Sequence, residues 1–269
     1  MRTLSLFHIL QNSLGNRNIH EFENSLDKLI EVADQKNDYS LSSGLLGIGW
    51  LISFLNQYEI FDLDVEQILS EIDDQVYRLA INEIVTEPPN LERIIEIVTY
   101  YQQRLKISFR SFYRGLIAQE ATLLLIDRIL AIISSRKISP SAMSKILLKL
   151  SSLALDFKER SLEEAFYREM EAAINYFETK VEEKDGNDME AIMFLLLAAY
   201  QYKNSDWEER LEKLKSEIFN FCSCRIESLA YLANLFRSKM NEISTLMDLN
   251  MDNDSFFSII TDLKFKLPT

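Results

Sequence analysis

Apolar residues recur at helical spacing along most of the chain, and no stretch keeps the strict alternation that is typical of a half-buried strand. Polar or proline-containing breaks separate the helical stretches. Amphipathic helices, with one apolar stripe and one charged face, are predicted at residues 19–35, 64–85, 161–184 and 205–221. Helices that are apolar almost all round are predicted at residues 44–58, 189–202 and 225–237.

Capping residues predict where several helices begin, because their side-chain oxygens accept hydrogen bonds from the first helical turn. The predicted caps are Asp64 with Gln67, Asn90, Ser139 before Pro140, Ser161 with Glu164, and Ser205 with Glu208. Further helices are expected at residues 111–136, at residues 142–158 and in the tail after residue 254.

The two kinds of helix alternate along the chain. A helix that is apolar on all sides must be covered on all sides, whereas an amphipathic helix covers one neighbour and meets water. The alternation therefore predicts inner helices covered by outer helices in an all-α chain. We expect one domain over residues 1–269, either a closed α,α-toroid or an incomplete or shortened arc of one. The chain shows no repeat of fixed length, so tetratricopeptide, ankyrin and HEAT arrays are not expected.

Composition and charge narrow the range of partners. The 269 residues carry a net charge of −13, and no stripe of Lys and Arg offsets it. Such a surface repels phosphate backbones, so nucleic acid is not expected as a partner, whereas a basic partner is favoured. The longest apolar run, residues 191–200, is about half of what a membrane span requires. A soluble protein is therefore expected.

The cysteine content predicts a reducing compartment. Cys222 and Cys224 are the only two cysteines, and with one residue between them they are too close for an ordinary structural disulfide. The N-terminal stretch has no small-residue cleavage site of the secretory type. We therefore expect a cytoplasmic protein.

Three glycines, Gly44, Gly47 and Gly49, open the first apolar helix in the segment SGLLGIGW. Their order is not that of a dinucleotide-binding fingerprint, polar residues precede them, and the lysine of a phosphate-binding loop is missing. A packing role is favoured instead. Gly44 would permit a turn that most residues resist, and Gly47 would let a neighbouring helix approach closely.

The segment SGLLGIGW, Ser43–Trp50, resembles the SGLAGIGW signature of lanthionine synthetase C-like (LanC-like) proteins. The resemblance continues through ILSEIDDQVY at residues 68–77 and YYQQRL at residues 100–105. It implies an α,α-toroid in which glycine-rich turns open the inner helices. It also implies a zinc site in the active members, where two Cys and one His hold a metal that activates a peptide thiol for addition to a dehydroamino acid.

The chain departs from that family at the zinc ligands. Neither tryptophan is followed by a cysteine, and Cys224 leads an apolar helix but is followed by Arg225 where the family has His. A catalytic zinc requires three protein ligands and one open position. Here the third ligand would have to be His8 or His20. We therefore expect no zinc or other cofactor, and Cys222 and Cys224 are the candidates if a metal is bound.

Three functions remain open. The first is a non-catalytic LanC-like protein that binds a peptide or a partner enzyme in a bacterial peptide-modification pathway, in an oligomer or hetero-complex. If this first function is correct, the rim around Trp50 and Arg225 would contact the partner. The second is a metal-dependent, thioether cyclase-like enzyme with substituted ligands, and the third is a plain helical scaffold.

One further segment is a candidate for binding. SFRSFYRGL contains Arg110 and Tyr113 among other aromatic and basic residues. It is either a surface for an acidic or aromatic peptide, or the start of a helix packed on its neighbour.

Overall fold

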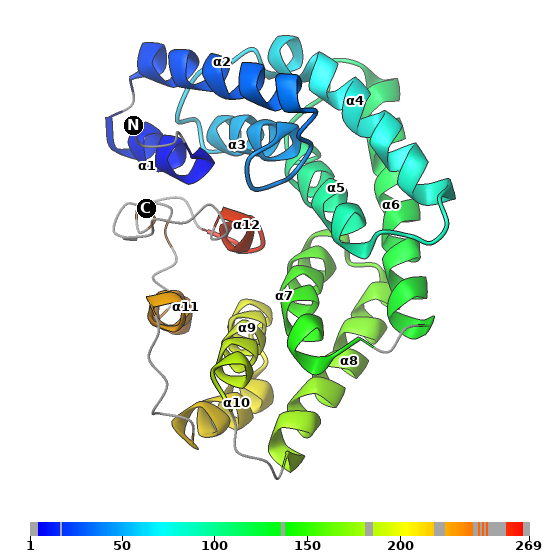
Figure 1. The fold of residues 1–269 in the computed structure, drawn as a ribbon, viewed down its shortest axis with the longest axis vertical. Coiled ribbons are helices and arrows are strands. Elements are labelled where there is room, and N and C mark those ends of the chain that lie inside the picture. The colour runs from blue at the N-terminus through cyan, green and yellow to red at the C-terminus, as the bar shows by residue number, and fades with distance from the viewer. Residues whose placement is uncertain are drawn as a thin grey trace. The chain divides into compact units, whose positions relative to one another are not determined.

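The computed structural model describes residues 5–16, 18–135, 138–180, 185–217, 224–238, 242, 244, 246 and 257–265. Regular structure in these residues is helical, with no strand element, which confirms the predicted all-α class (Figure 1). The chain divides into two compact units: Met1–Ser134 with Leu246–Thr261, and Ser135–Thr245 with Asp262–Thr269. In the described part of the chain, no helix combines the length and apolar character needed to cross a membrane.

The helices follow the predicted stretches closely. The first unit contains α1 (Leu6–Asn16), α2 (Ile19–Lys36), α3 (Leu45–Gln57), α4 (Val65–Val85), α5 (Leu91–Arg104), α6 (Phe112–Ser135) and α12 (Phe257–Ile260). The second contains α7 (Pro140–Phe157), α8 (Arg160–Thr179), α9 (Gly186–Tyr202), α10 (Ser205–Glu217) and α11 (Cys224–Arg237). Of these, α1 was not predicted from the sequence.

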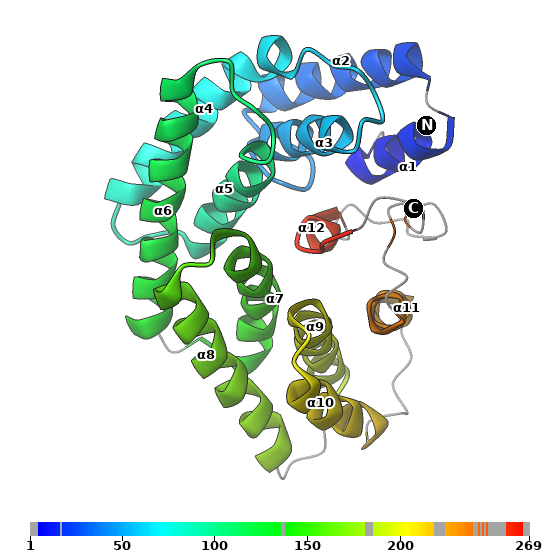
Figure 2. The ribbon, with the colours of Figure 1, turned by 180° about the vertical axis from the view of Figure 1, so that it is seen from behind.

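In the first unit, α3 is the central helix. Every residue from Leu45 to Leu55 is buried, and α3 packs against α1, α2, α4 and α5 (Figure 2). The surrounding helices α2 and α4 each bury a single stripe; on α2 it consists of Phe22, Leu26, Leu29 and Ala33. The predicted contrast between apolar and amphipathic helices therefore corresponds to covered and covering helices within this unit.

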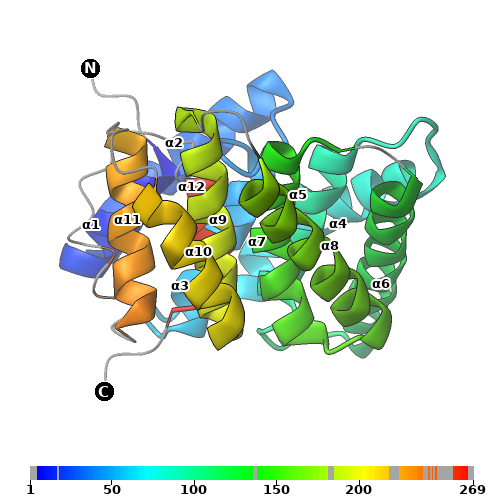
Figure 3. The same ribbon diagram turned by 90° about the horizontal axis from the view of Figure 1, so that it is seen from below.

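In the second unit, α7 and α9 take the covered positions. Residues 146–154 of α7 and 191–201 of α9 are buried without interruption. α9 packs against α7, α10 and α11, and α8 packs against α7 (Figure 3). α11 does not match the prediction of a helix apolar all round: it buries Leu229, Leu232, Ala233, Leu235 and Phe236, while Tyr231 and Asn234 on its other side are exposed.

Three of the predicted helix caps are confirmed. The side chains of Asp64, Asn90 and Ser139 accept hydrogen bonds from the backbone N–H groups three residues further on, at 3.2 to 3.3 Å. The predicted caps at Ser161 and Ser205 are wrong, because both helices begin earlier. α8 starts at Arg160, which pairs with Glu164 at 2.7 Å and so engages the predicted capping partner.

Two caps of the second unit were missed. Asn204 caps α10 by accepting a hydrogen bond from the Trp207 backbone N–H at 3.3 Å, and asparagine is among the preferred cap residues. α9 starts at Gly186, ahead of the predicted boundary, where Asp185 and Asp188 form a reciprocal capping box. Both helices are capped in the ordinary way, but by a residue other than the one expected from the sequence.

A polar network anchors the C-terminal segment to the second unit. The Lys149 ammonium, which is 1% exposed, pairs with the Asp262 carboxylate at 3.2 Å. The Gln201 amide nitrogen donates to Ser151 Oγ at 3.0 Å and to the Asp262 carbonyl at 3.1 Å. The Gln201 amide oxygen accepts from the Lys264 N–H at 2.9 Å. Burial lowers the pKa of Lys149.

The three glycines lie where α3 is most crowded. A Cβ on Gly44 would lie 2.4 Å from the Asp38 carbonyl oxygen, and a Cβ on Gly47 would lie 2.1 Å from the Leu41 carbonyl oxygen. As expected, Gly47 lets a neighbouring helix approach closely, since its Cβ would also lie 2.5 Å from Cδ1 of Leu6 on α1. A Cβ on Gly49 would lie 2.4 Å from Cε2 of a buried tyrosine on α5. Since Gly44 has φ −104°, crowding rather than a left-handed conformation is the constraint.

Replacing Gly47 with alanine tests this crowding. Because the added methyl group would overlap a backbone oxygen, we expect Gly47→Ala to lower the free energy of unfolding by about 1–3 kcal/mol in urea denaturation. Gly186→Ala is the matched control, since a Cβ at Gly186 meets no heavy atom within 4 Å. It should change the free energy of unfolding by less than about 1 kcal/mol. Equal effects of the two substitutions would contradict the packing role.

Candidate functional site

Exposed apolar side chains of the first unit are concentrated on α4 and α6. Most of the large apolar side chains that the described residues expose lie on these two helices, with exposed fractions from 40% to 76%. We call this set the α4–α6 surface: Tyr77, Ile81 and Val85 on α4, and Phe112, Tyr113, Leu116, Ile117 and Leu124 on α6. A surface helix usually carries polar residues on its outer side, so this concentration indicates an interaction surface.

The spacing of these residues places them in rows. Tyr77, Ile81 and Val85 recur every four residues and so lie on one side of α4. Tyr113, Ile117 and Leu124 likewise share one side of α6. The opposite side of α6 holds its buried residues, among them Ala118, Ala121, Thr122, Leu125, Ile126 and Ile129. α6 therefore carries large apolar residues on its exposed side as well as on its buried side.

Two arginines of α6 bridge to α4. Arg114 donates to the Asp74 carboxylate at 2.9 Å and to the Ser70 carbonyl oxygen at 3.4 Å. Arg128 donates to the Glu87 carboxylate at 2.6 Å and to the carbonyl oxygen of Thr86, the residue that caps the end of α4, at 2.8 Å. Since the earlier arginine meets the earlier part of α4, the two helices run in the same direction (Figure 2).

A cleft of about 270 Å³ opens between α4 and α6. Its lining consists of Asp73, Asp74, Tyr77, Tyr101, Phe109, Arg114, Ile117 and Ala118. Tyr77 and Ile117 belong both to the cleft and to the α4–α6 surface. Because cavities of about 150 Å³ already hold a benzene ring, this cleft has room for a large apolar side chain.

A buried ionic network supports the cleft from below. The Arg104 side chain is fully buried and donates from Nη2 to Glu66 at 2.8 Å and to Asp73 at 3.1 Å. Tyr100 donates its hydroxyl to the same Asp73, and the Arg104 guanidinium carbon lies 3.8 Å from the centre of the Phe109 ring. Burial raises the pKa of Asp73, against the opposing effect of Arg104. The network thus joins α5, α4 and a cleft-lining residue.

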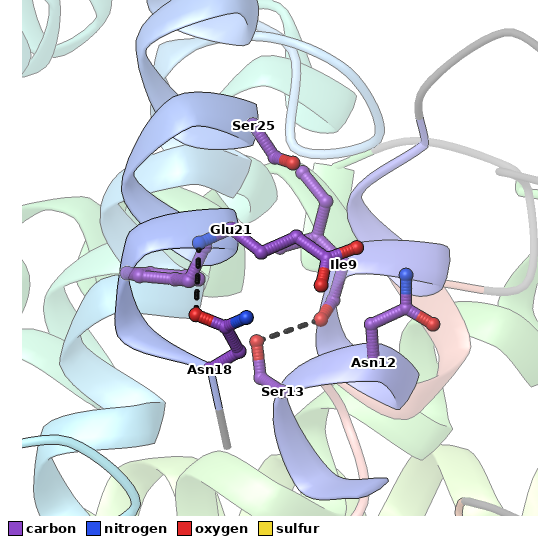
Figure 4. A pocket seen from close by; sticks show the side chains of 7 residues that line it. Ile9, Asn12, Ser13, Asn18, Glu21 and Ser25 are labelled. Carbon is purple, nitrogen blue, oxygen red and sulfur yellow. Dashed lines mark hydrogen bonds between the residues drawn. The ribbon is translucent and has the colours of Figure 1, made fainter. Parts of the chain in front are cut away.

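Two other hollows lie in the first unit. The one between α1 and α2 measures about 20 Å³, which is room for a single water molecule (Figure 4). Its Ser13 hydroxyl donates to the Ile9 carbonyl and its Asn18 side chain caps α2, so these groups already serve their own helices. The other, of about 400 Å³ beside α4, is lined mainly by polar and charged residues such as Asp34, Glu71 and Arg78.

The residues proposed from the sequence for partner contact differ in their exposure to solvent. Trp50 is 3% exposed and its ring contacts Phe54 and Phe257, at 4.7 and 5.3 Å between ring centroids. Trp50 is a core residue, and a side chain this deeply buried is not available for the expected contact with a partner. The Arg225 side chain lies outside the described residues, and its backbone belongs to the second unit.

Arg110 and Tyr113 are both exposed, with Arg110 paired to Asp64 at 2.7 Å and Tyr113 exposed to 75%. Phe112 is 76% exposed as well, whereas Phe109 is packed on the buried Arg104. Of the two interpretations of this segment, packing on a neighbour therefore holds for Phe109 but not for Phe112 and Tyr113, which open α6.

The described residues do not fit a zinc site. Among them, no group of three or more His, Cys, Asp and Glu side chains is placed to hold a metal. His8 lies 3.3 Å from the Asn12 amide, and His20 lies 3.5 Å from Glu23, each on its own helix. Cys222 and the Cys224 side chain lie outside the described residues.

Comparison of the chain with family models, with curated proteins and with solved structures gave no match. The likeness to LanC-like proteins therefore rests on the residues quoted above. Apart from Tyr113, the α4–α6 surface was missed in the sequence, although one signal was present: α6 carries Ile117 and Leu124 on the side opposite its buried stripe.

Replacing Arg104 tests the buried network. Arg104→Met leaves two carboxylates largely buried without their partner, so we expect it to lower the free energy of unfolding by about 3–5 kcal/mol. Arg110→Met is the matched control, because the Arg110 side chain is 71% exposed in its ion pair. An exposed pair contributes at most about 1 kcal/mol, so the control should stay close to the unchanged chain in urea denaturation. Similar stabilities of the two variants would show that the network does not support the cleft.

Proposed function

We propose that the chain is a non-catalytic LanC-like protein that binds a peptide or a partner enzyme in a bacterial peptide-modification pathway. Binding takes place on the α4–α6 surface. The observation that carries this proposal is the row of exposed apolar residues on α6 beside a cleft that can accept a large side chain. Surfaces of this kind in soluble proteins are typical of interaction sites.

The α,α-toroid, closed or incomplete, is part of the same proposal. Its support is the order of burial along the chain: α3, α7 and α9 are covered over most of their length, and α5 over its second half. The helices α2, α4, α6 and α8, which alternate with them, bury one stripe each. Such alternation within each unit is what an inner and an outer layer require.

The proposal that this protein is not catalytic rests on the residues that could hold a metal or act as a base. Activation of a thiol at neutral pH calls for a Lewis acid or a strong base beside it. In this chain Arg225 stands where the LanC-like pattern has His, and the two histidines of α1 and α2 interact with residues of their own helices. These residues are suited to a protein that binds its peptide without reacting with it.

Peptide binding is testable with the peptides encoded beside the gene. We expect at least one to bind the full chain, measured by fluorescence anisotropy, and Ile117→Arg to weaken it about tenfold or more because it removes a central apolar contact. Val32→Arg is the control, since Val32 is 45% exposed on α2 and is not part of the α4–α6 surface. Binding that Ile117→Arg leaves intact would place the site elsewhere, and absence of binding by all peptides would contradict the proposal.

Metal content separates this function from a metal-dependent enzyme. We expect protein purified without chelators to contain far less than one zinc per chain by elemental analysis, with no change in Cys224→Ser, because the third ligand is missing. One zinc per chain that is lost in Cys222→Ser or Cys224→Ser would overturn the non-catalytic assignment.

A further inference from the structure

We propose that the α4–α6 cleft receives a basic amphipathic helix from the partner. This inference rests on the proposed function and adds the chemistry of the segment that would be bound. Among the described residues, the helices α4 and α6 combine an apolar surface, acidic groups beside it and an apolar cleft.

The shape of the site favours a helix as the occupant. Two helices that run in the same direction form the walls, and Tyr77 and Ile117 face the same cleft, so one inserted side chain would contact both. From Tyr113 to Leu124 the exposed apolar residues of α6 extend over about 16 Å at about 1.5 Å per residue, which is the length of a helix of about three turns. Amphipathic helices bind in such grooves through apolar anchors spaced three, four and seven residues apart.

The charges of the site favour a basic helix. The exposed row of α6 reads Tyr113, Ile117, Glu120, Leu124 and Asp127, with acidic residues interspersed among apolar ones. Glu120 and Asp127 are exposed, and no ion pair is found for either carboxylate among the described residues. Lys or Arg residues placed between the apolar anchors of a partner helix would meet these carboxylates, so apolar and charged contacts reinforce each other.

The same charges disfavour two other occupants. In a symmetric dimer through α6, Glu120 and Asp127 would lie close to the same carboxylates of a second copy, and each chain carries a net charge of −13. An anionic membrane surface would be repelled for the same reason. A basic helix is the occupant whose charge complements the row.

Two designed helical peptides with identical apolar positions test the inference, one with Lys and the other with Glu between the anchors. We expect the Lys peptide to bind the full chain about tenfold or more tightly than the Glu peptide, and the difference to shrink when salt is raised from about 50 to about 300 mM. In the double variant Glu120→Lys with Asp127→Lys, the preference should shift toward the Glu peptide.

A second variant separates docking in the cleft from general attraction to an acidic protein. Ile117→Asp adds a negative charge but removes an apolar anchor, so we expect it to weaken the Lys peptide about tenfold despite the added charge. Tyr176→Asp is the matched control, because Tyr176 is 42% exposed on α8 in the second unit. It should bind the Lys peptide as tightly as the unchanged chain. Circular dichroism checks that both variants remain helical.

The possible failures are distinguishable. Equal binding of the Lys peptide by Ile117→Asp and the unchanged chain would overturn the inference. If the peptides encoded beside the gene bind through the α4–α6 surface but the charge swap alters no preference, the proposed function stands and the basic helix is wrong. If neither native nor designed peptides bind, both fail. A dimer in sedimentation that Ile117→Asp dissociates would assign the surface to a second copy and likewise overturn the inference.

Discussion

The need to cover helices that are apolar on every side is the constraint on which the rest of this structure depends. α3 buries an unbroken run from Leu45 to Leu55, which no single neighbour can cover, and α1, α2, α4 and α5 all pack on it. Such close packing leaves no room for a side chain at Gly47 or Gly49. In the second unit, α9 has the same requirement, and α7, α10 and α11 meet it. The glycine cluster is therefore a consequence of packing density rather than a ligand-binding device.

α6 is an exception, because part of its apolar surface is not covered by neighbouring helices. This exception suggests a function. Its buried stripe is covered, yet its exposed side still carries Tyr113, Ile117 and Leu124. Long arginine side chains bridge α6 to α4, and an apolar cleft opens between the two helices. The buried Arg104 network joins α5 to α4 beneath that cleft. An apolar surface of this kind costs free energy in water, which is recovered when a partner covers it.

Most of the secondary structure could be predicted from sequence, because periodicity and capping are local. The caps at Asp64, Asn90 and Ser139 follow from residue type alone. The one-sided burial of α11 could not be predicted, since it depends on which neighbours are available rather than on its own residues. The burial of Trp50 depends on Phe257, about two hundred residues away in the chain. The cleft was missed because it requires α4 and α6 to be side by side, which the arginine pairs of α6 reveal only in three dimensions.

Hydrogen–deuterium exchange of the full chain, with and without the bound peptide, tests the central claim most directly, because it reports which helices a partner covers. The account predicts slower exchange in residues 70–87 and 112–128, which include the α4–α6 surface and the cleft residues of both helices, and unchanged exchange in α8 and α10 of the second unit. Protection confined to the second unit, or absent from α6, would contradict the claim that the apolar side of α6 is the surface that a partner covers.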